Sequence, residues 1–444
     1  MVSRIRGTQK ILDFKFYFLL RTMHTKKKLT NGLTLITAPL KETKAVTVLV
    51  LLPVGSRHET KSTNGVSHFI EHLLFKGTKK RPTSLDVTKE LDAVGAEYNA
   101  FTSKDHTGYY VKLAADKIEL AFDILSDMLL HAAFPAAEVE KERGVIIEEI
   151  NMYEDNPLIH VETLFEQSVF SSHPLGWPIS GPRSVIRNVS RAQLLAHKNR
   201  FYSPSAMVLT VAGSFDRARV AKLAERYFGR VSASQSRGAI HRVTIGQTKP
   251  RAVTMYKKTQ QIQLCLGFSS YGLSSPNIFP LALLSIILGG NMSSRLFMVI
   301  REQHSLAYNI RAGAHSYQDA GTFMVQAGVD RQRLTQAITL ILRELRRVKD
   351  EPVSAKELKD AKAFLRGKLI LDLEDSESVA DWFGKQELML GKLYTPQERL
   401  KKIFAVTPAQ IQRVAREVIR TQRLNLALIG PYRDGTSFIK LLKV

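Results

Sequence analysis

Two histidines and a glutamate lie within five residues of one another, as His68, Glu71 and His72. Side chains four residues apart share one face of an α-helix, so the two imidazoles can bind one metal ion between them. The Glu71 carboxylate reaches the same edge of such a helix, and its apolar neighbours Phe69 and Leu73 can seat the helix in a core. Two imidazoles with one further ligand and a water suit a catalytic Zn²⁺.

An ordinary helix is the alternative interpretation of this stretch. Three specified residues at this spacing recur by chance in about one of a hundred chains of this size. Histidines on a half-apolar helix belong more often to a core or a surface than to a metal site. The zinc interpretation therefore depends on a third ligand elsewhere in the chain.

The best candidate for that ligand is Glu149, which lies seven residues after Glu142. Seven residues make two helical turns, so both carboxylates face the same way, beside Val145 and Ile146. Carboxylates at an apolar contact are costly unless they are paired, and a metal ion and a ligating histidine would pair them. We expect Glu149 to bind zinc and Glu142 to accept an N–H from a ligating imidazole. Glu148 points about 100° away and is the poorer candidate.

Composition limits the class of protein. The 444 residues are too many for one ordinary core, so two domains of about 200 residues each are expected. Cys265 is the only cysteine, which excludes an intrachain disulfide and a thiolate zinc cluster, so any metal must bind His and Asp/Glu. The net charge is +23, yet the basic residues form no recognisable nucleic-acid-binding motif, and we expect no nucleic-acid partner.

The N-terminal extension, residues 1–22, is basic and carries a short apolar patch interrupted by Lys15. This patch is too short and too charged to span a bilayer, so we expect no transmembrane segment. A transit-type presequence and a misassigned start, with Met23 opening the fold, both remain open. We expect a cytoplasmic protein, or one of the mitochondrial matrix if residues 1–22 are a transit sequence.

Hydrophobic periodicity places the motif within a domain of residues 23–231. In this domain Gly32 is predicted to lie in a turn before a strand, and Gly95 at the C-terminal end of a helix. Strands are predicted at 33–37, 46–52, 97–102, 107–113 and 206–212, and helices at 84–94, 117–130, 136–154, 158–170, 190–201 and 216–228.

The same order of elements returns after a polar linker at 232–249, in a domain of residues 250–444. Strands are predicted at 252–257, 261–268, 306–316, 321–328 and 425–429, and helices at 277–288, 293–302, 330–349, 354–372, 376–390 and 407–420. This repetition indicates an internal duplication in which the second copy lacks the His-x-x-Glu-His motif. We expect an α+β fold of two homologous domains, each a mainly antiparallel sheet with helices packed on one face.

His-x-x-Glu-His is the inverzincin order, and the chain resembles the insulinase-type inverzincin family from about Leu29 to Gly430. The matching segments, besides the zinc helix and the Glu142/Glu149 pair, are Asn99-Ala100-Phe101-Thr102, Tyr153-Glu154-Asp155-Asn156-Pro157, Ser294-Arg295-Leu296-Phe297 and Arg301-Glu302-Gln303-His304-Ser305-Leu306-Ala307-Tyr308. The length resembles the half-length members, which include bacterial zinc proteases. Only Gly289-Gly290 stands where the non-catalytic subunit of mitochondrial processing peptidase has an extended glycine-rich loop, so the chain resembles the catalytic subunit.

The resemblance implies a zinc endopeptidase with one Zn²⁺ per chain. Glu71 would take the proton of the attacking water, and Tyr308 and Arg301 would stabilise the oxyanion. The strand that contains Asn99, Ala100, Phe101 and Thr102 would bind a peptide substrate as an added strand. Because the half-length relatives pair into clam-shells, we expect a homodimer, with a heterodimer as the alternative, and Arg301 and Tyr308 of one subunit serving the zinc of the other.

Three other functions compete with this one. A member of the same fold could act without catalysis, as do the core subunits of the respiratory bc1 complex, although the intact metal motif argues against it. A processing peptidase acting on presequences is a second alternative. A basic nucleic-acid-binding protein is the third, supported by net charge alone.

Overall fold

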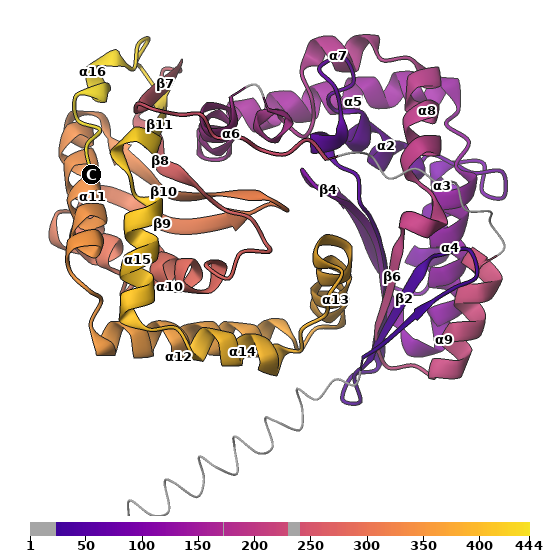
Figure 1. The fold of residues 1–444 in the computed structure, drawn as a ribbon. Coiled ribbons are helices and arrows are strands. Elements are labelled where there is room, and N and C mark those ends of the chain that lie inside the picture. Colours follow the sequence, from indigo (N-terminus) through magenta and orange to yellow (C-terminus); the bar gives the residue numbers. More distant parts are fainter. Residues whose placement is uncertain (1–23, 172, 230–239) are drawn as a thin grey trace, which may run out of the picture.

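Two β-sheets, one from each half of the chain, organise the molecule, and helices pack on them (Figure 1). The computed structural model describes residues 24–171, 173–229 and 240–444. Each half combines one mostly antiparallel sheet with helices, which confirms the predicted α+β fold of two similar halves. The extension at 1–22 and residues 232–239 of the predicted linker lie outside the described residues.

The first sheet has six strands in the order β1-β2-β6-β3-β5-β4. All its pairs are antiparallel except β2 with β6. The strands are β1 (Thr25–Lys28), β2 (Thr34–Pro39), β3 (Ala45–Leu52), β4 (Glu97–Thr102), β5 (Thr107–Ala114) and β6 (Val208–Gly213). Among the described residues, β4 pairs with β5 alone, so one of its sides is an open edge.

The second sheet has five strands in the order β7-β11-β8-β10-β9, which repeats the order β2-β6-β3-β5-β4 of the first sheet. Its parallel pair, β7 with β11, stands where β2 pairs with β6 in the first sheet. The strands are β7 (Arg251–Tyr256), β8 (Gln261–Tyr271), β9 (Ala307–Ser316), β10 (Ala320–Asp330) and β11 (Asn425–Gly430). The edge strand β9 therefore corresponds to β4, which agrees with an internal duplication.

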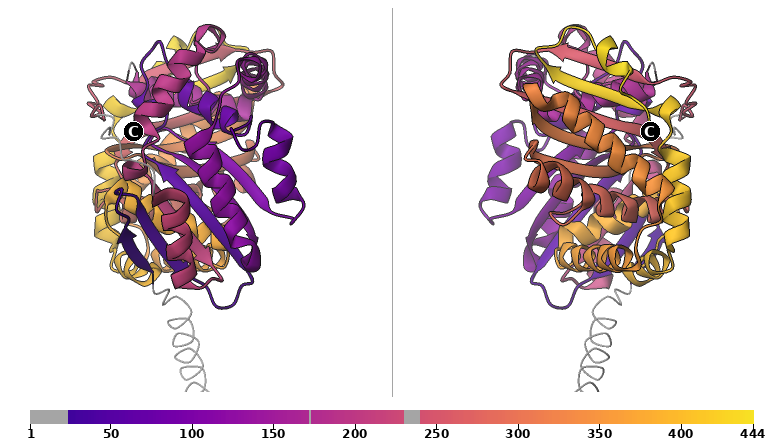
Figure 2. Two further views of the ribbon diagram at one scale, coloured as in Figure 1. Left: turned by 90° about the vertical axis from the view of Figure 1, so that its right-hand side faces the viewer. Right: turned by 90° about the vertical axis from the view of Figure 1, so that its left-hand side faces the viewer.

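Helices of each half cover the outer face of its own sheet, as the two side views show (Figure 2). The first half contains α2 (Val66–Leu74), α3 (Ser84–Asp92), α4 (Ile118–His131), α5 (Ala136–Asp155), α6 (Pro157–Phe170), α7 (Arg183–Asn188), α8 (Arg191–Phe201) and α9 (Arg217–Ala224). The second half contains α10 (Ile278–Gly289), α11 (Leu334–Asp350), α12 (Ala355–Asp372), α13 (Ser376–Leu390), α14 (Pro396–Phe404), α15 (Pro408–Val418) and α16 (Thr436–Ile439).

The inner face of the first sheet is covered by a helix of the second half, α13. Val379, Ala380 and Phe383 of α13 pack against Leu49 and Leu51 of β3. The other face of β3 packs against the helices of its own half. Because both faces of β3 are buried, its sequence is almost continuously apolar rather than alternating.

The second sheet receives a helix of the first half in the same way. Phe165 and Val169 of α6 pack with Cys265 of β8 and with Ala427 and Ile429 of β11. The two halves thus exchange one helix each, and in Figure 1 α6 and α13 lie between the halves at opposite ends.

A buried arginine joins the halves next to the open edge strand. The Arg57 guanidinium donates to Asp105, in the turn that follows β4, at 3.1 Å, and to Asp319 of the second half at 2.5 Å. Asp105 also accepts the backbone N–H of Gln318 at 2.9 Å. The side chains of Arg57 and Asp105 are buried, so this ion pair is shielded from solvent, and with the pair to Asp319 it fixes the end of β4 against the second half.

Most predicted elements agree with the observed ones to within a few residues, but some do not. The helix predicted at 293–302 is present but begins later than predicted, and its residues Phe297–Gln303 form a π-helix. Sequence patterns missed β1, α7, α14 and α16, all of which have at most nine residues. Residues 240–249 of the predicted linker carry no helix or strand.

Candidate metal centre and active site

Helix α2 presents the central motif, and a buried carboxylate fixes its N-terminus. Gly65 precedes the helix with φ of 98°, in the left-handed region that glycine adopts at little cost. Glu59, which is 3% exposed, accepts the backbone N–H groups of Gly65 and Ser67 at 2.7 Å. These are donors that a helix start leaves free, so the carboxylate caps α2. Phe69 and Leu73 are fully buried, as predicted.

His68, His72 and Glu149 converge on one point. The Oε2 atom of Glu149, on α5, lies 3.4 Å from Nε2 of His68 and 3.4 Å from Nε2 of His72. Ligand atoms bound to Zn²⁺ at about 2.0–2.1 Å in a tetrahedron lie about 3.4 Å apart. One atom from each of the three residues lies within 4.8 Å of the other two, so the set can bind one metal ion.

A buried carboxylate oxygen of this cluster that accepts no hydrogen bond from the described residues also fits a metal ion. Oε2 of Glu149 is buried, yet it accepts no hydrogen bond within the described parts of the chain. A buried carboxylate oxygen without a hydrogen bond is costly, and a cation would remove that cost. Two imidazoles and one carboxylate with a free fourth position are the donor set of catalytic zinc sites. The residues present therefore fit zinc.

Opposite charges are concentrated at this point. Burial lowers the pKa of His72, but the neighbouring Glu142 and Glu149 carboxylates outweigh burial and raise this pKa to about 9. Burial alone would raise the pKa of Glu149, whereas His68 and His72 hold it well below its usual range. A metal ion that binds here must displace a proton from His72.

Glu142 lies where the sequence placed it, behind His72. Nδ1 of His72 donates to its Oε2 atom at 3.1 Å, which leaves Nε2 directed at Glu149. The other oxygen pairs with Nζ of Lys76 at 2.7 Å. Burial opposes ionisation of Glu142, but His72 and Lys76 keep its pKa below the ordinary value. The pairing fixes the His72 tautomer, which a metal ligand requires.

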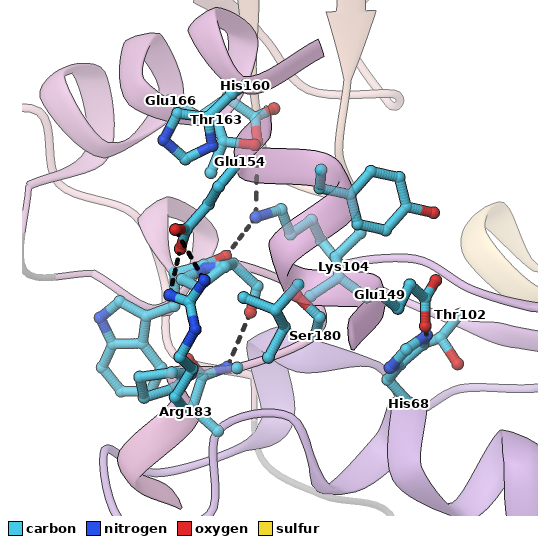
Figure 3. A pocket seen from close by; sticks show the side chains of 18 of the residues that line it. His68, Thr102, Lys104, Glu149, Glu154, His160, Thr163, Glu166, Ser180 and Arg183 are labelled. Carbon is cyan, nitrogen blue, oxygen red and sulfur yellow. Dashed lines mark hydrogen bonds and ion pairs between the residues drawn. The ribbon is translucent and has the colours of Figure 1, made fainter. Parts of the chain in front are cut away.

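His68 and Glu149 of the metal cluster line a cavity of about 840 Å³, whose lining among the described residues does not include His72. Glu71 faces this cavity, and one of its oxygens accepts the Thr102 hydroxyl at 2.5 Å. Figure 3 shows His68, Glu149 and Thr102 together at one end, and Arg183 paired with Glu154 at the other. The cavity therefore has room for a ligand beside the metal cluster.

Part of the predicted substrate strand borders this cavity. Ala100, Phe101 and Thr102 line it together with His68 and Glu71, whereas Asn99 does not. Their strand, β4, is the open edge of its sheet, so its backbone can accept a further strand.

Arg301 and Tyr308 lie in the second half and are absent from the cavity lining formed by the described residues. The guanidinium carbon of Arg301 lies 5.2 Å from the centroid of the Tyr308 ring, and the tyrosine is 77% exposed. The structure therefore brings the pair together but not to the metal cluster of its own chain.

The sequence did not indicate that three residues of the site, Lys76, Glu59 and Thr102, contact the motif helix or the residues that support it. Lys76 follows His72 by four residues, so helical spacing could have indicated it. Glu59 and the Thr102 hydroxyl reach the motif only through the fold, and no local pattern indicates either contact.

Comparison with known proteins identifies the family. Residues 35–183 match the insulinase family, peptidase family M16, and residues 188–365 match the peptidase M16 inactive domain. The uncharacterized zinc protease YmxG of Bacillus subtilis is 34% identical over 401 residues, which cover 90% of this chain and 97% of the relative. An uncharacterized zinc protease of Mycobacterium leprae is 34% identical and covers 94% of each chain. The chain belongs to the insulinase family.

Solved structures share the fold. A protease from Helicobacter pylori superposes with a TM-score of 0.86 at 23% identity, over 92% of this chain and all of the other. A peptidase M16 inactive domain from Pseudomonas fluorescens gives 0.86 at 17% identity, over 93% of this chain and all of the other. A chain of Complex III2 from Candida albicans gives 0.81 at 18% identity, over 95% of this chain and all of the other. Within the described residues, no helix is both long and apolar enough to cross a membrane.

Proposed function

We propose that the protein is a zinc-dependent endopeptidase that hydrolyses unfolded peptides and binds one Zn²⁺ per chain. One observation carries this proposal. His68, His72 and Glu149 converge beside a cavity that His68, Glu149, Glu71 and residues of the open edge strand β4 line.

Side chains of the site have separate roles in the proposed reaction. When bound, zinc polarises a carbonyl and lowers the pKa of a water. Glu71 is not part of the metal cluster, so its carboxylate is available to accept the proton of the attacking water and to pass it to the leaving amine. Glu142 and Lys76 hold His72 in the orientation that leaves Nε2 for the metal.

The position of β4 favours extended substrates. A peptide that adds to this edge gains backbone hydrogen bonds that depend little on its sequence. The end of β4 lies beside Glu71, so the added strand would run past the metal cluster. A folded protein offers no such free strand, and unfolded peptides are therefore the substrates we propose.

Oxyanion stabilisation is the part of the reaction that we assign to a second subunit. Arg301 and Tyr308 supply a cation and a phenol, which suit a developing oxyanion, but they lie away from the cavity of their own chain. In a homodimer, the pair of one subunit would serve the metal of its partner, and symmetry would create two equivalent sites. A related second chain could take the partner's place.

Two alternatives remain within the same fold. One is a non-catalytic core or chaperone-like protein, and the other is a processing peptidase that removes presequences. The complete metal set, with Glu71 beside it, favours catalysis over the first. Cleavage confined to presequence-like peptides would support the second.

The test is degradation of a mixed library of unstructured peptides, followed by mass spectrometry. The zinc-loaded protein should cleave many of them internally, and the chelator-treated protein should cleave none until zinc is restored. A stably folded protein of similar composition serves as the control and should stay intact. A zinc-loaded, dimeric preparation that cleaves no library member would contradict the proposal.

A further inference from the structure

Thr102 is the last residue of the edge strand β4, and its side chain faces the motif helix. Alternate residues of β4 face opposite sides. Tyr98 and Ala100 pack in the core that contains α2, whereas Phe101 packs on the side of α13. Thr102 shares the face of Ala100, and its hydroxyl donates to Oε2 of Glu71 at 2.5 Å.

This hydrogen bond constrains a group that is otherwise free to turn. The terminal torsion of a glutamate side chain is broad, so an unbonded carboxylate samples many orientations. Within the described parts of the chain, Thr102 is the one hydrogen-bond donor to Glu71. With Oε2 occupied, the other oxygen remains for a proton from the cavity side, which both residues line.

We propose that Thr102 is a positioning residue for Glu71, and that its hydroxyl, rather than a substrate contact, is its contribution to the reaction. The inference rests on the proposed role of Glu71 as the general base. It also links two functions, because the same strand would accept the peptide and orient the base. The proposal adds a role for the Thr102 side chain to the peptide-binding role that the family resemblance implies for its strand.

The main test compares Thr102→Val, which keeps the shape of the side chain, with the wild type. Misorienting a catalytic group costs up to about 100-fold in rate, so kcat should fall between about tenfold and 100-fold. KM and zinc content should stay within about twofold, and Thr102→Ser should restore most of the rate. Thr25→Val is the matched control, because it removes a hydroxyl contact with Thr37, at 2.7 Å, on the opposite edge of the same sheet. It should leave kcat unchanged.

Two further readouts separate positioning from substrate binding. Affinity for an uncleaved peptide, compared between Glu71→Gln and the double variant with Thr102→Val, should agree within about twofold. A tenfold loss of affinity, or an unchanged kcat in Thr102→Val, would overturn the proposal.

A crystal structure of Thr102→Val is a test that does not depend on measurable peptide cleavage. It should show the Glu71 carboxylate displaced or in several orientations, and a carboxylate that keeps its place would overturn the proposal. If the wild type cleaves no peptide, the proposed function fails, while this structural comparison still decides the role of Thr102.

Discussion

At the scale of residues, the metal cluster follows from local periodicity. Spacings of four and seven residues on helices put His68 beside His72 and turn Glu142 and Glu149 to one face, and the fold brings both pairs together. Those four positions could be predicted because a helix fixes the direction of each side chain. The contact between Thr102 and Glu71 could not, because it spans 31 residues and joins a strand to a helix.

The choice between two adjacent glutamates gives the first prediction. Zinc affinity should fall at least about 100-fold in Glu149→Gln, since changes to groups behind a ligand already cost 10–100-fold. Glu148→Gln should bind zinc as the wild type does, because the Glu148 carboxylate pairs with Asn151 instead. Metal analysis after dialysis against a weak chelator measures both. Zinc loss confined to Glu148→Gln would show that the ligand assignment is wrong.

At the scale of elements, two exchanged helices hold the halves together. Sequence periodicity predicted α6 and α13 as helices, but it could not show that each packs on the sheet of the other half. An apolar helix face indicates burial without naming its partner. The helix at Phe297–Gln303 was predicted, but its π type could not be, since its residues fit an α-helical pattern equally well.

Close packing of α13 gives the second prediction. A Cβ atom on Gly384 would lie 2.8 Å from Leu51 and 2.9 Å from Thr210, so Gly384→Leu should overpack this contact and lower the free energy of unfolding by about 1–3 kcal/mol. Gly367 of α12 has open space around it, and Gly367→Ala should raise the same quantity by about 0.5–1 kcal/mol. Chemical denaturation measures both variants. Equal stability of Gly384→Leu and the wild type would contradict the packing described.

At the scale of the whole molecule, the chain carries all its proposed catalytic groups but not in one place. The metal cluster belongs to the first half, and the exposed Tyr308 belongs to the second, stacked with Arg301. A 77% exposed tyrosine beside a cation is available to another subunit. This arrangement motivates the proposed homodimer, as does the pairing of half-length chains that the family resemblance implies.

Subunit exchange gives the third prediction. Glu71→Gln and Tyr308→Phe should each be nearly inactive as homodimers. If the tyrosine acts across the interface, a mixed dimer collects both changes at one site and leaves the other site intact. Activity per mixed dimer should then approach half of the wild-type value, measured after exchange of differently tagged subunits. No recovery in verified mixed dimers, or full activity in a strictly monomeric protein, would contradict the cross-subunit arrangement.

The most direct test of zinc-dependent hydrolysis with Glu71 as the general base is the Glu71→Gln variant, in which metal binding and turnover are measured on the same sample. The substitution removes the proton acceptor and leaves His68, His72 and Glu149 untouched. We expect this variant to bind one zinc per chain with wild-type stability and to hydrolyse peptides about 10²–10⁴-fold more slowly. A zinc-loaded Glu71→Gln protein that cleaves peptides within a few-fold of the wild-type rate would contradict the role of Glu71 as the general base.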